Sequence, residues 1–406
     1  MSNIDKCLRF LILWPIYNKE DIMLLGYGAK NCWCFKDWLD ISLRLNGYAP
    51  EDISLNKACS SILGFEGANA SGKTSALKIF AFIADFAKNS FLYSPETPIL
   101  YDSFSNNNAQ SEFYVEFIGN NNAEYRYEAI LKKENVKQEK LFLIKGVAEE
   151  IIFQRDGNKI ILNELYDNET KIIFRKNASF ISTLHQYDIQ EIDPIYDFFN
   201  RNTINVTYTG LRYEIRKDVP AVSEMYNQNR SALNFTKKLI HKFDTGITDI
   251  KISFRESEKN KKIFFPIFFH ENANATFKLG IDSESTGTKA LYINLLYYYM
   301  NLQSGGVLLL DEFDINLHHD ILPHLLNLFT NPKSNPKNAQ MIFTSLNPDI
   351  LDILGKYRAY LFEKEDGESF GYRLDEPDTN ILRNDRKVSA PYRRHLLGGY
   401  PRIHEA

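Results

Sequence analysis

Residues 67–74 read GANASGKT and match the pattern G-x-x-x-x-G-K-[ST]. Glycines let such a loop fold back so that its backbone N–H groups face a phosphate, and the following helix presents its N-terminus to the same anion. Lys73 is expected to reach the β- and γ-phosphates of a nucleotide, and the Thr74 hydroxyl is expected to coordinate Mg²⁺. The alternative is a glycine turn that joins a strand to a helix without a ligand. The expected nucleotide-binding residues of this loop are Gly67, Asn69, Ser71, Gly72, Lys73, Thr74 and Ser75.

Residues 307–312 read VLLLDE, an apolar stretch that ends in two carboxylates. Buried as a strand beside the phosphate loop, it would bring Asp311 to its carboxyl end, where this side chain would hold the Mg²⁺ shell. Glu312 would orient and deprotonate the attacking water. Taken alone, the stretch fits a buried strand with a polar end equally well, so its functional interpretation depends on the phosphate loop upstream.

The elements around these motifs follow the order strand, glycine loop, helix. Residues 60–67 are an apolar run that ends in glycine, and residues 73–89 carry apolar side chains at helical spacing. Residues 306–311, 339–345 and 358–364 are apolar runs separated by amphipathic stretches, which is typical of a parallel sheet with helices on its faces. The two ends of the chain therefore predict one α/β layer around a central insertion.

The central insertion is predicted to begin with β-structure and to continue with helices. Residues 112–175 contain β-rich stretches separated by Asn and Gly turns, which indicates an antiparallel meander, and residues 176–245 are mostly helical. Residues 248–254 and 262–269 return to strand, joined by a charged hairpin connection. The expected segments are an N-terminal extension (1–22), the N-terminal half of the core (23–111), the β-rich and helical insertion (112–270) and the C-terminal half of the core (271–406).

Composition excludes several classes of protein. The 406 residues are 44% hydrophobic, enough to bury a core, so wholesale disorder is not expected. The 48 Lys and Arg against 52 Asp and Glu give a net charge of −4, without the basic excess that by itself marks a nucleic-acid binder. Cys7, Cys32, Cys34 and Cys59 have no second pair downstream to complete a zinc site, which favours a reduced, cytoplasmic protein. Residues 9–17 are too short for a membrane span, and neither a signal peptide nor a membrane anchor is expected.

Several motifs resemble those of a known family. Two of them are the loop residues Asn69 and Ser71 and the pentapeptide ESTGT at 284–288, which precedes an apolar helix. A third is the octapeptide DEFDINLH at 311–318. Together they resemble the ABC-type ATPases of the SMC and OLD branch, and more narrowly the AAA-family ATP-binding proteins of bacterial abortive-infection and anti-phage systems.

The resemblance extends from about residue 23 to the C-terminus. Residues 28–43 are similar to the family's opening strand pair, and residues 391–401 are similar to its closing motif. The resemblance implies an α/β fold with an ABC-type P-loop ATPase core, in which a mixed sheet is flanked by helices and carries an antiparallel β-meander and a helical insertion. It also implies ATP and Mg²⁺ as cofactors.

The resemblance assigns a role to the residues before the apolar helix. It implies that Ser285 and Gly287 form a signature that contacts the γ-phosphate bound by the opposite subunit, so that the protein forms a homodimer or a higher oligomer through its ATP sites. A small hydroxyl and a glycine at a helix N-terminus do make an anion-binding surface. The same residues fit a simple helix cap, with Ser285 or Thr286 as the N-cap.

The chain departs from the family at one position. The family pattern places a histidine that senses the γ-phosphate after the strand at 339–345, and this chain has Leu346, which cannot donate a side-chain hydrogen bond. Hydrolysis is therefore expected to be slow, unless another group such as Asn347 substitutes. His318 and His319 lie where the family has its dimer-contacting D-loop. A metal is not expected there, because neighbours on a helix point about 100° apart. The glutamine of the Q-loop could not be assigned.

Three classes of function remain after these considerations. The first is an ATPase that senses a nucleic acid or phage-derived trigger and controls a separate toxic effector, such as a nuclease or a Toprim-domain protein. The second is an SMC-like ATPase of DNA repair or chromosome structure, although the sequence has neither a long heptad series nor a basic groove signal. The third is a non-catalytic scaffold gated by nucleotide. This hypothesis remains because Leu346 stands where the family has its γ-phosphate-sensing histidine. A nuclease domain of its own is not expected, because few residues follow Pro348 before the closing motif.

Overall fold

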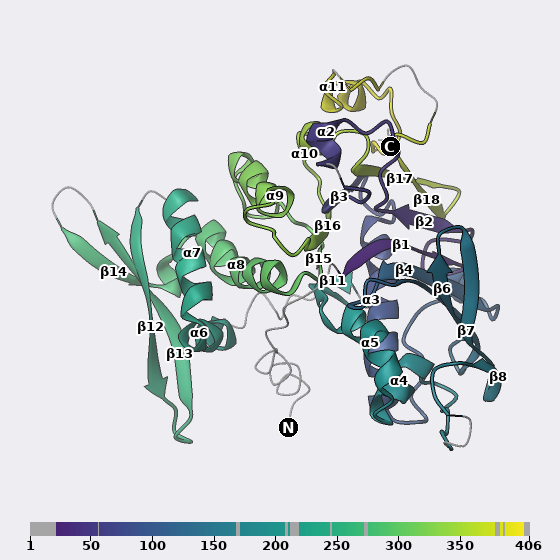
Figure 1. Cartoon of the computed structure of the whole chain (residues 1–406). Coiled ribbons are helices and arrows are strands. Elements are labelled where there is room, and N and C mark those ends of the chain that lie inside the picture. The colour runs from purple at the N-terminus through teal and green to yellow at the C-terminus, as the bar shows by residue number, and fades with distance from the viewer. Residues whose placement is uncertain are drawn as a thin grey trace. The chain divides into compact units, whose positions relative to one another are not determined.

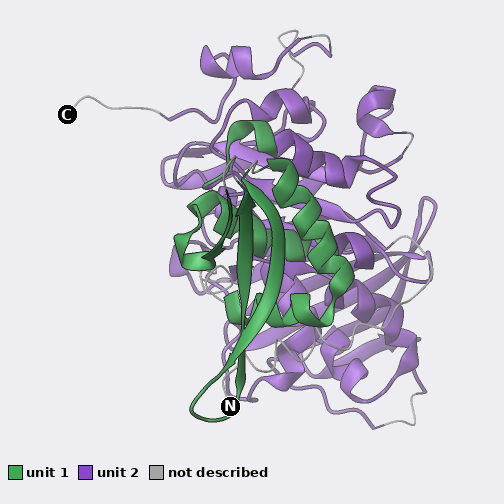
Figure 2. Cartoon of the chain, turned by 90° about the vertical axis from the view of Figure 1, so that its left-hand side faces the viewer, with its two compact units in different colours: residues 1–20, 213–300, 316–321 green, residues 21–212, 301–315, 322–406 purple. Residues whose placement is uncertain are grey.

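The structure is a computed structural model that describes residues 22–401, except for 56, 168–170, 208–209, 212–218, 244–245, 272–274, 378–381 and 385. The chain divides into two compact units (Figure 2), of which unit 2 contains 21–212, 301–315 and 322–406. Unit 1 contains 1–20, 213–300 and 316–321. The expected insertion contributes to both units, and the expected extension lies outside the described residues apart from Ile22. None of the described helices is long and apolar enough to cross a membrane.

Unit 2 is built on a mixed sheet. Its described strands are β3 (Ile62–Gly67), β9 (Thr203–Ile204), β15 (Val307–Leu310), β16 (Gln340–Thr344), β17 (Ala359–Glu365) and β18 (Glu368–Arg373). Their order is β18-β17-β3-β16-β15-β9, so the phosphate-loop strand β3 lies inside the sheet (Figure 1). Each pair from β17 to β9 is parallel, and β18 runs antiparallel to β17. This arrangement confirms the predicted parallel runs.

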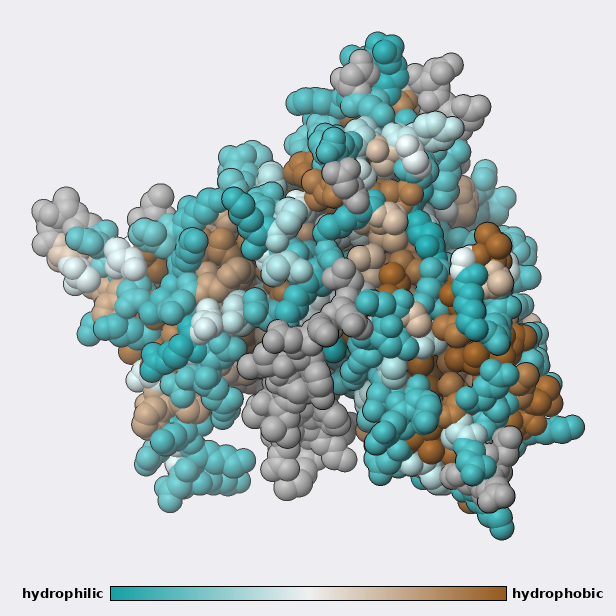
Figure 3. Space-filling model, viewed as in Figure 1, coloured by the Kyte–Doolittle hydropathy of each residue, from teal (hydrophilic) through white to brown (hydrophobic). Residues whose placement is uncertain are grey.

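A second, antiparallel sheet of unit 2 contains the predicted meander. Its described strands are β1 (Met23–Lys30), β2 (Leu39–Ser42), β4 (Ser111–Ile118), β5 (Glu124–Lys132), β6 (Asn135–Lys145), β7 (Ala148–Asp156) and β8 (Lys159–Asn163). They lie in the order β2-β1-β4-β5-β6-β7-β8. β4 and β5 alternate buried and half-buried residues, as expected for strands with one face on the core. Figure 3 shows hydrophobic side chains over this region, on the right of the view. The exposed hydrophobic residues of its strands and turns include Val147, Ile160 and Ile161.

Helix α3 (Lys73–Asn89) is buried on most of its circumference because it lies between the two sheets. It contacts β1 and β4 of the antiparallel sheet and β3 and β16 of the mixed sheet. Helices α9 (Leu322–Thr330) and α10 (Ile350–Leu354) pack on β3 as well. The mixed sheet flanked by helices, with its attached meander, confirms the predicted fold class. The further described elements of unit 2 are α2 (Glu51–Ser54), α4 (Phe180–Gln186), α5 (Asp193–Asn200), α9 (Leu322–Thr330), α10 (Ile350–Leu354), α11 (Ser389–Arg393), β10 (Val206–Thr207) and β11 (Gly210–Leu211).

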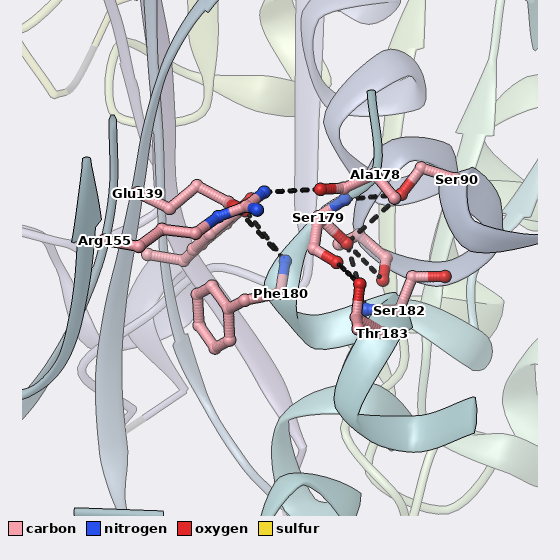
Figure 4. Close-up of polar contacts among 10 residues, drawn as sticks. Ser90, Glu139, Arg155, Ala178, Ser179, Phe180, Ser182 and Thr183 are labelled. Atoms are coloured by element: carbon pink, nitrogen blue, oxygen red, sulfur yellow. Dashed lines mark hydrogen bonds and ion pairs between the residues drawn. The ribbon is translucent and has the colours of Figure 1, made fainter. Parts of the chain in front are cut away.

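A buried ion pair fixes the meander to helix α4 (Figure 4). Glu139 on β6 and Arg155 on β7 have fully buried side chains, and the Arg155 Nε donates to Glu139 Oε2 at 2.5 Å. Glu139 also accepts the backbone N–H of Phe180 at 3.1 Å, at the start of α4, and the hydroxyl of Tyr127. Removing one partner of such a pair typically costs about 3–5 kcal/mol, because the other charge stays buried. The network therefore makes the meander and α4 one structural block.

Unit 1 contains a small antiparallel sheet with helices on one face. Its described elements are α6 (Val219–Gln228), α7 (Arg230–Phe243), β12 (Ile247–Glu256), β13 (Lys262–Glu271), β14 (Thr276–Gly280) and α8 (Thr286–Ser304), whose last turn is assigned to unit 2. The sheet order is β12-β13-β14, and β12 and β13 form the predicted hairpin. Phe268 of β13 packs on Tyr292 of α8, and the Tyr226 hydroxyl of α6 donates to the Tyr292 carbonyl at 2.8 Å. The helices thus cover the face of the sheet that carries Phe268.

Candidate nucleotide-binding site

The phosphate loop joins β3 to α3 and uses left-handed backbone conformations. The φ angle is +152° at Gly67, +61° at Ala70 and +116° at Gly72. A Cβ atom on Gly72 would lie 3.1 Å from the ring of Phe35, so a larger residue there would be strained and crowded. Helix α3 begins at Lys73, directly after the loop, and its first N–H groups are free to bind an anion.

The predicted residues of the loop differ in exposure. Ser71 is only 2% exposed, and within the described part of the chain its hydroxyl has no hydrogen-bond partner. A buried polar atom of this kind requires a partner, and a phosphate oxygen would provide one. Asn69 is exposed. Ser75 is half-buried and lines a hollow of about 420 Å³ together with Trp33 and Asp102. The loop therefore fits a phosphate chain.

Lys73 points its ammonium group back into the loop. Its Nζ donates to the carbonyl oxygens of Gly67 at 2.6 Å and Ala68 at 2.9 Å. Burial lowers the pKa of Lys73, and the negative charges of Asp311 and Asp314 oppose this shift. The ammonium is thus held at the loop, where phosphate oxygens could replace the two carbonyl oxygens as its hydrogen-bond acceptors.

Thr74 and Asp311, which are 237 positions apart in the chain, meet at the edge of the mixed sheet. The Thr74 hydroxyl lies 3.1 Å from Oδ1 and 3.0 Å from Oδ2 of Asp311. The Thr344 hydroxyl donates to Asp311 Oδ1 at 2.6 Å. Hydroxyl and carboxylate oxygens are the ligands that Mg²⁺ prefers in nucleotide sites. The two residues predicted to hold the metal are therefore adjacent, and their donor atoms suit that ion.

Asn205 is a residue of this site that the sequence did not reveal. It follows the two-residue strand β9, which pairs in parallel with β15. Its Oδ1 accepts the backbone N–H of Asp311 at 2.8 Å, and its Nδ2 donates to the Asp311 carbonyl at 3.2 Å. The amide therefore extends the pairing of β9 and β15 by one residue and fixes the position of Asp311.

Glu312, the predicted base, stands at a sharp backbone turn. Its φ angle is +54°, which is uncommon for a residue with a side chain. Its N–H donates to the Thr344 hydroxyl at 2.8 Å, and the next N–H, of Phe313, donates to the Thr344 carbonyl at 3.0 Å. Thr344 thus contacts both acidic residues and holds the turn between them.

Leu346 occupies the position expected for a histidine and is 56% exposed. Its backbone N–H donates to Asp314 Oδ2 at 3.3 Å, and the Ser345 hydroxyl donates to the same oxygen at 3.0 Å. The Asn347 Oδ1 accepts the N–H of Asp349 at 3.1 Å, which caps the turn before α10. No described contact of Leu346 replaces the side-chain donor of a histidine.

Glu66 is a second residue that the sequence did not reveal. It is the last residue of β3 before Gly67, and it is only 3% exposed. Burial raises the pKa of Glu66 to about 9, and the charge of Lys73 opposes this shift. The side chain is therefore neutral at physiological pH, and it leaves the positive charge of Lys73 available for an anion.

The proposed signature residues lie at the start of α8 in unit 1. The Ser285 hydroxyl accepts the N–H of Thr288 at 3.0 Å, so Ser285 is an N-cap, as in one of the two alternatives from the sequence. A Cβ atom on Gly287 would lie 2.9 Å from the carbonyl oxygen of Asn316. Glu284 next to the cap is bound by His270 Nε2 at 2.7 Å. The role of Ser285 and Gly287 toward a phosphate remains a prediction.

His318 and His319 do not diverge as neighbours on a regular helix would. Asn316 has a φ of +62°, and only residues 319–321 form a short 3₁₀ turn. The two imidazole rings therefore lie 4.2 Å apart, with the Asp320 carboxylate 3.3 Å from His319 Nε2. All three residues are exposed. The geometric reason for expecting no metal was wrong, although exposed groups of this kind are common without one.

Comparison with known proteins identifies the fold and the family. No curated protein matches the chain. Among solved structures, the SMC head bound to the C-winged helix domain of ScpA matches with a TM-score of 0.50 and 13% identity, over 86% of this chain and 96% of that chain. The SMC head domain from Thermotoga maritima has a TM-score of 0.43 and 12% identity, over 86% of this chain and 98% of that chain. The first of these likenesses supports the ABC-type P-loop ATPase fold.

The sequence profile of one family matches residues 62–352, which include the phosphate loop, the Asp311–Glu312 pair and the proposed signature. This range covers most of the chain. It begins at the first residue of β3 and ends within α10. The chain belongs to the AAA family that is described as "AAA domain, putative AbiEii toxin, Type IV TA system".

Proposed function

We propose that this protein binds ATP with Mg²⁺ and hydrolyses it slowly. The observation that carries the proposal is the contact of the Thr74 hydroxyl with the Asp311 carboxylate, which brings the phosphate loop and the acidic strand end together. The buried, unpaired Ser71 hydroxyl and the cation of Lys73 at the loop support it further.

Each residue has a distinct task in this proposal. Lys73 leaves the loop carbonyls and binds the β- and γ-phosphates, while the N–H groups of the loop and of α3 bind the remaining oxygens. Thr74 and Asp311 hold Mg²⁺, which supplies charge neutralisation on the phosphate oxygens. Glu312 takes the proton of the attacking water. Asn205 and Thr344 keep the two acidic residues in place.

We further propose that two copies close on ATP. In that closed state Ser285 and Gly287 at the N-terminus of α8 would bind the γ-phosphate held by the other copy. A capped helix N-terminus with a glycine in its first turn can accept an anion at its remaining N–H groups. The oligomer would then be a homodimer or a higher assembly linked through its nucleotide sites.

In the cell, we propose that the closed and open states regulate a separate toxic effector during anti-phage defence. The family description refers to a toxin of a type IV toxin–antitoxin system, which supports a role beside such an effector. A nucleotide can control a partner only if the partner binds the two states with different affinity. The effector is expected to be a nuclease or a Toprim-domain protein, with its contacts in the segment 112–270.

Calorimetry with ATP and Mg²⁺ tests the nucleotide site. Lys73→Ala should abolish binding, because the loop loses its fixed cation, while the circular dichroism spectrum remains that of the parent. Equal affinity of the variant and the wild type for ATP would show that Lys73 does not bind the phosphates.

The regulatory role is tested by co-purifying the product of the neighbouring gene with wild-type and Glu312→Gln protein, with and without ATP. Equal retention in all four conditions would contradict gating.

A nucleotide-gated scaffold without turnover is the second candidate, and the absence of a side-chain donor at Leu346 favours it. In that case ATP would bind and close the dimer without release of phosphate. Measuring binding and phosphate release on the same preparation separates the two candidates.

A further inference from the structure

The three-stranded sheet of unit 1 has a second face, opposite the face covered by its helices. Figure 2 shows unit 1, which contains this sheet, in green. Alternate residues of the central strand β13 point to this second face, since Phe268 and Pro266 are buried on the helix side. The β13 residues on the second face are Ile263, Phe265, Ile267 and Phe269, and all four are half-buried.

Exposed cations lie on both sides of this apolar row. Lys251 pairs with Ile267, and Arg255 pairs with Ile263, so both belong to the same face on strand β12. On the other side, Lys278 of β14 pairs with Phe269. The acidic residues of this face are Asp249, which is bound by Lys237 at 2.7 Å, and Glu271 at the end of β13.

The ring of Phe269 already accepts two of these cations. Lys251 Nζ lies 4.8 Å and Lys278 Nζ lies 5.2 Å from the ring centroid. Such contacts are weak where water has access, so a flat aromatic ligand could displace the ammonium groups from the ring. The displaced lysines would remain close to that ligand and could pair with its negative charges.

An apolar row with flanking cations matches single-stranded nucleic acid in chemistry. Proteins that bind single strands combine aromatic side chains, on which bases stack, with cations that follow the phosphates. A strand rise of about 3.4 Å per residue places Phe265 and Phe269 about 14 Å apart along β13. A sheet whose central strands carry stacking aromatics is also the way in which one common class of RNA-binding domain holds unpaired bases.

We propose that this face of the β12–β14 sheet binds single-stranded nucleic acid, with bases stacked on Phe265 and Phe269 and phosphates held by Lys251, Arg255 and Lys278. An unpaired strand suits the face better than a duplex, because the bases of a duplex are stacked on each other and do not offer their faces. The binding requires no hydrolysis of ATP. Only the idea that the bound strand triggers the ATPase rests on the function proposed above.

Fluorescence anisotropy of the full-length protein with labelled oligothymidylate and oligouridylate tests the proposal. Wild-type protein should bind both probes and should prefer them to a duplex of equal length. Phe269→Ala should weaken binding roughly tenfold or more, the loss expected for one base stack. Phe269→Leu keeps an apolar side chain and should weaken binding to a similar extent. A preference for duplex, or full binding by Phe269→Leu, would overturn the proposal.

The charge contribution has a matched control. Lys251→Glu with Lys278→Glu should abolish binding at physiological salt, while Lys137→Glu with Lys333→Glu, the same charge change at exposed lysines elsewhere, should leave it intact. Neutralising the first pair, as Lys251→Gln with Lys278→Gln, should reduce the slope of log affinity against log salt by about 1.4, or 0.7 for each lost phosphate contact. If the two glutamate pairs weaken oligonucleotide binding equally, binding depends on the net charge of the protein and not on this face, and the proposal is overturned.

Two further measurements distinguish this face from the nucleotide site and from a dimer interface. Lys73→Ala should keep the affinity for the oligonucleotide, since the phosphate loop takes no part. Loss of binding in that variant would mean that the probe occupies the nucleotide site, and it would overturn the proposal without affecting the function proposed for that site. Sedimentation of Phe269→Ala should match the wild type. Dissociation of an oligomer in this variant would show that a second copy covers the face, and it would overturn the proposal as well.

Discussion

The side-chain amide of Asn205 hydrogen-bonds both backbone groups of Asp311, with Oδ1 2.8 Å from the N atom and Nδ2 3.2 Å from the carbonyl oxygen. The amide takes the place of a further residue of β9 beside β15. The carboxylate of Asp311, which contacts Thr74, is therefore positioned by the side chain of the residue that follows the neighbouring strand β9. Its place does not depend on the phosphate loop alone.

Asn205→Ala should reduce turnover by about 10- to 100-fold while ATP still binds, because a small displacement of a catalytic group has an effect of this size. It should also lower the free energy of unfolding by about 1–3 kcal/mol, the cost of unpaired buried backbone groups. Asn202 provides the control, since its Oδ1 accepts the N–H of Val307 at 3.1 Å at the other end of β15. Asn202→Ala should cost similar stability and leave turnover nearly unchanged. Equal losses of turnover in the two variants would reduce Asn205 to a structural role.

Glu312→Gln keeps the shape of the side chain and removes the base. Turnover should fall by about 10²–10⁴, the range of a lost general base, while ATP and Mg²⁺ still bind. Light scattering with ATP should then show the closed dimer, because the bound nucleotide persists. Glu224→Gln on the exposed side of α6 is the control and should behave as the wild type. Unchanged turnover in Glu312→Gln would assign the base to another residue.

The parts of the site that are local in sequence could be predicted. The glycines, Lys73 and Thr74 follow each other in one loop, and the apolar run before Asp311 marks a buried strand. The meander could also be predicted, because alternating side chains and short turns mark each strand. These features depend on neighbours in the chain, which the sequence displays directly.

The parts that depend on distant neighbours could not be predicted. Strand β9 has two residues, too few for an alternating pattern, so the role of Asn205 follows only from its pairing with β15. Glu66 follows an apolar run in the sequence, and no pattern shows that the sheet encloses its carboxyl group. His318 and His319 were expected to diverge as helical neighbours, whereas the turn at Asn316 brings their rings together.

Leu346→His should raise the rate of ATP hydrolysis, because it restores a side-chain donor at the position where the family has one. Wild-type turnover should lie well below the common enzyme value of about 10 s⁻¹. Leu346 is 56% exposed, so the substitution should change stability by no more than about 0.5 kcal/mol. Leu346→Ala is the control and should bring no gain. Fast turnover of the wild type, or an equal gain in both variants, would show that another group already fills this role.

Glu66→Gln should change how stability depends on pH. The pKa of Glu66 is raised from 4.5 to about 9 by burial, so between these values the folded state binds a proton that the unfolded state does not. The contribution of Glu66 is therefore fully present below about pH 4.5 and is lost as pH rises toward 9. The glutamine variant does not titrate. Its stability relative to the wild type should increase with pH through this window, by up to about 1.4 kcal/mol per pH unit.

Urea unfolding of both proteins at several pH values measures this difference, and ATP binding at the same pH values connects it to the site. Above about pH 9 the ionised Glu66 carboxylate would compensate the charge of Lys73, so the affinity of the wild type for ATP should fall more steeply than that of Glu66→Gln. Glu365→Gln, at an exposed acid of β17, is the control and should follow the wild type in both measurements. Parallel stability curves for the wild type and Glu66→Gln would mean that the carboxyl group ionises at its ordinary pKa, and that the charge of Lys73 is already balanced before a nucleotide binds.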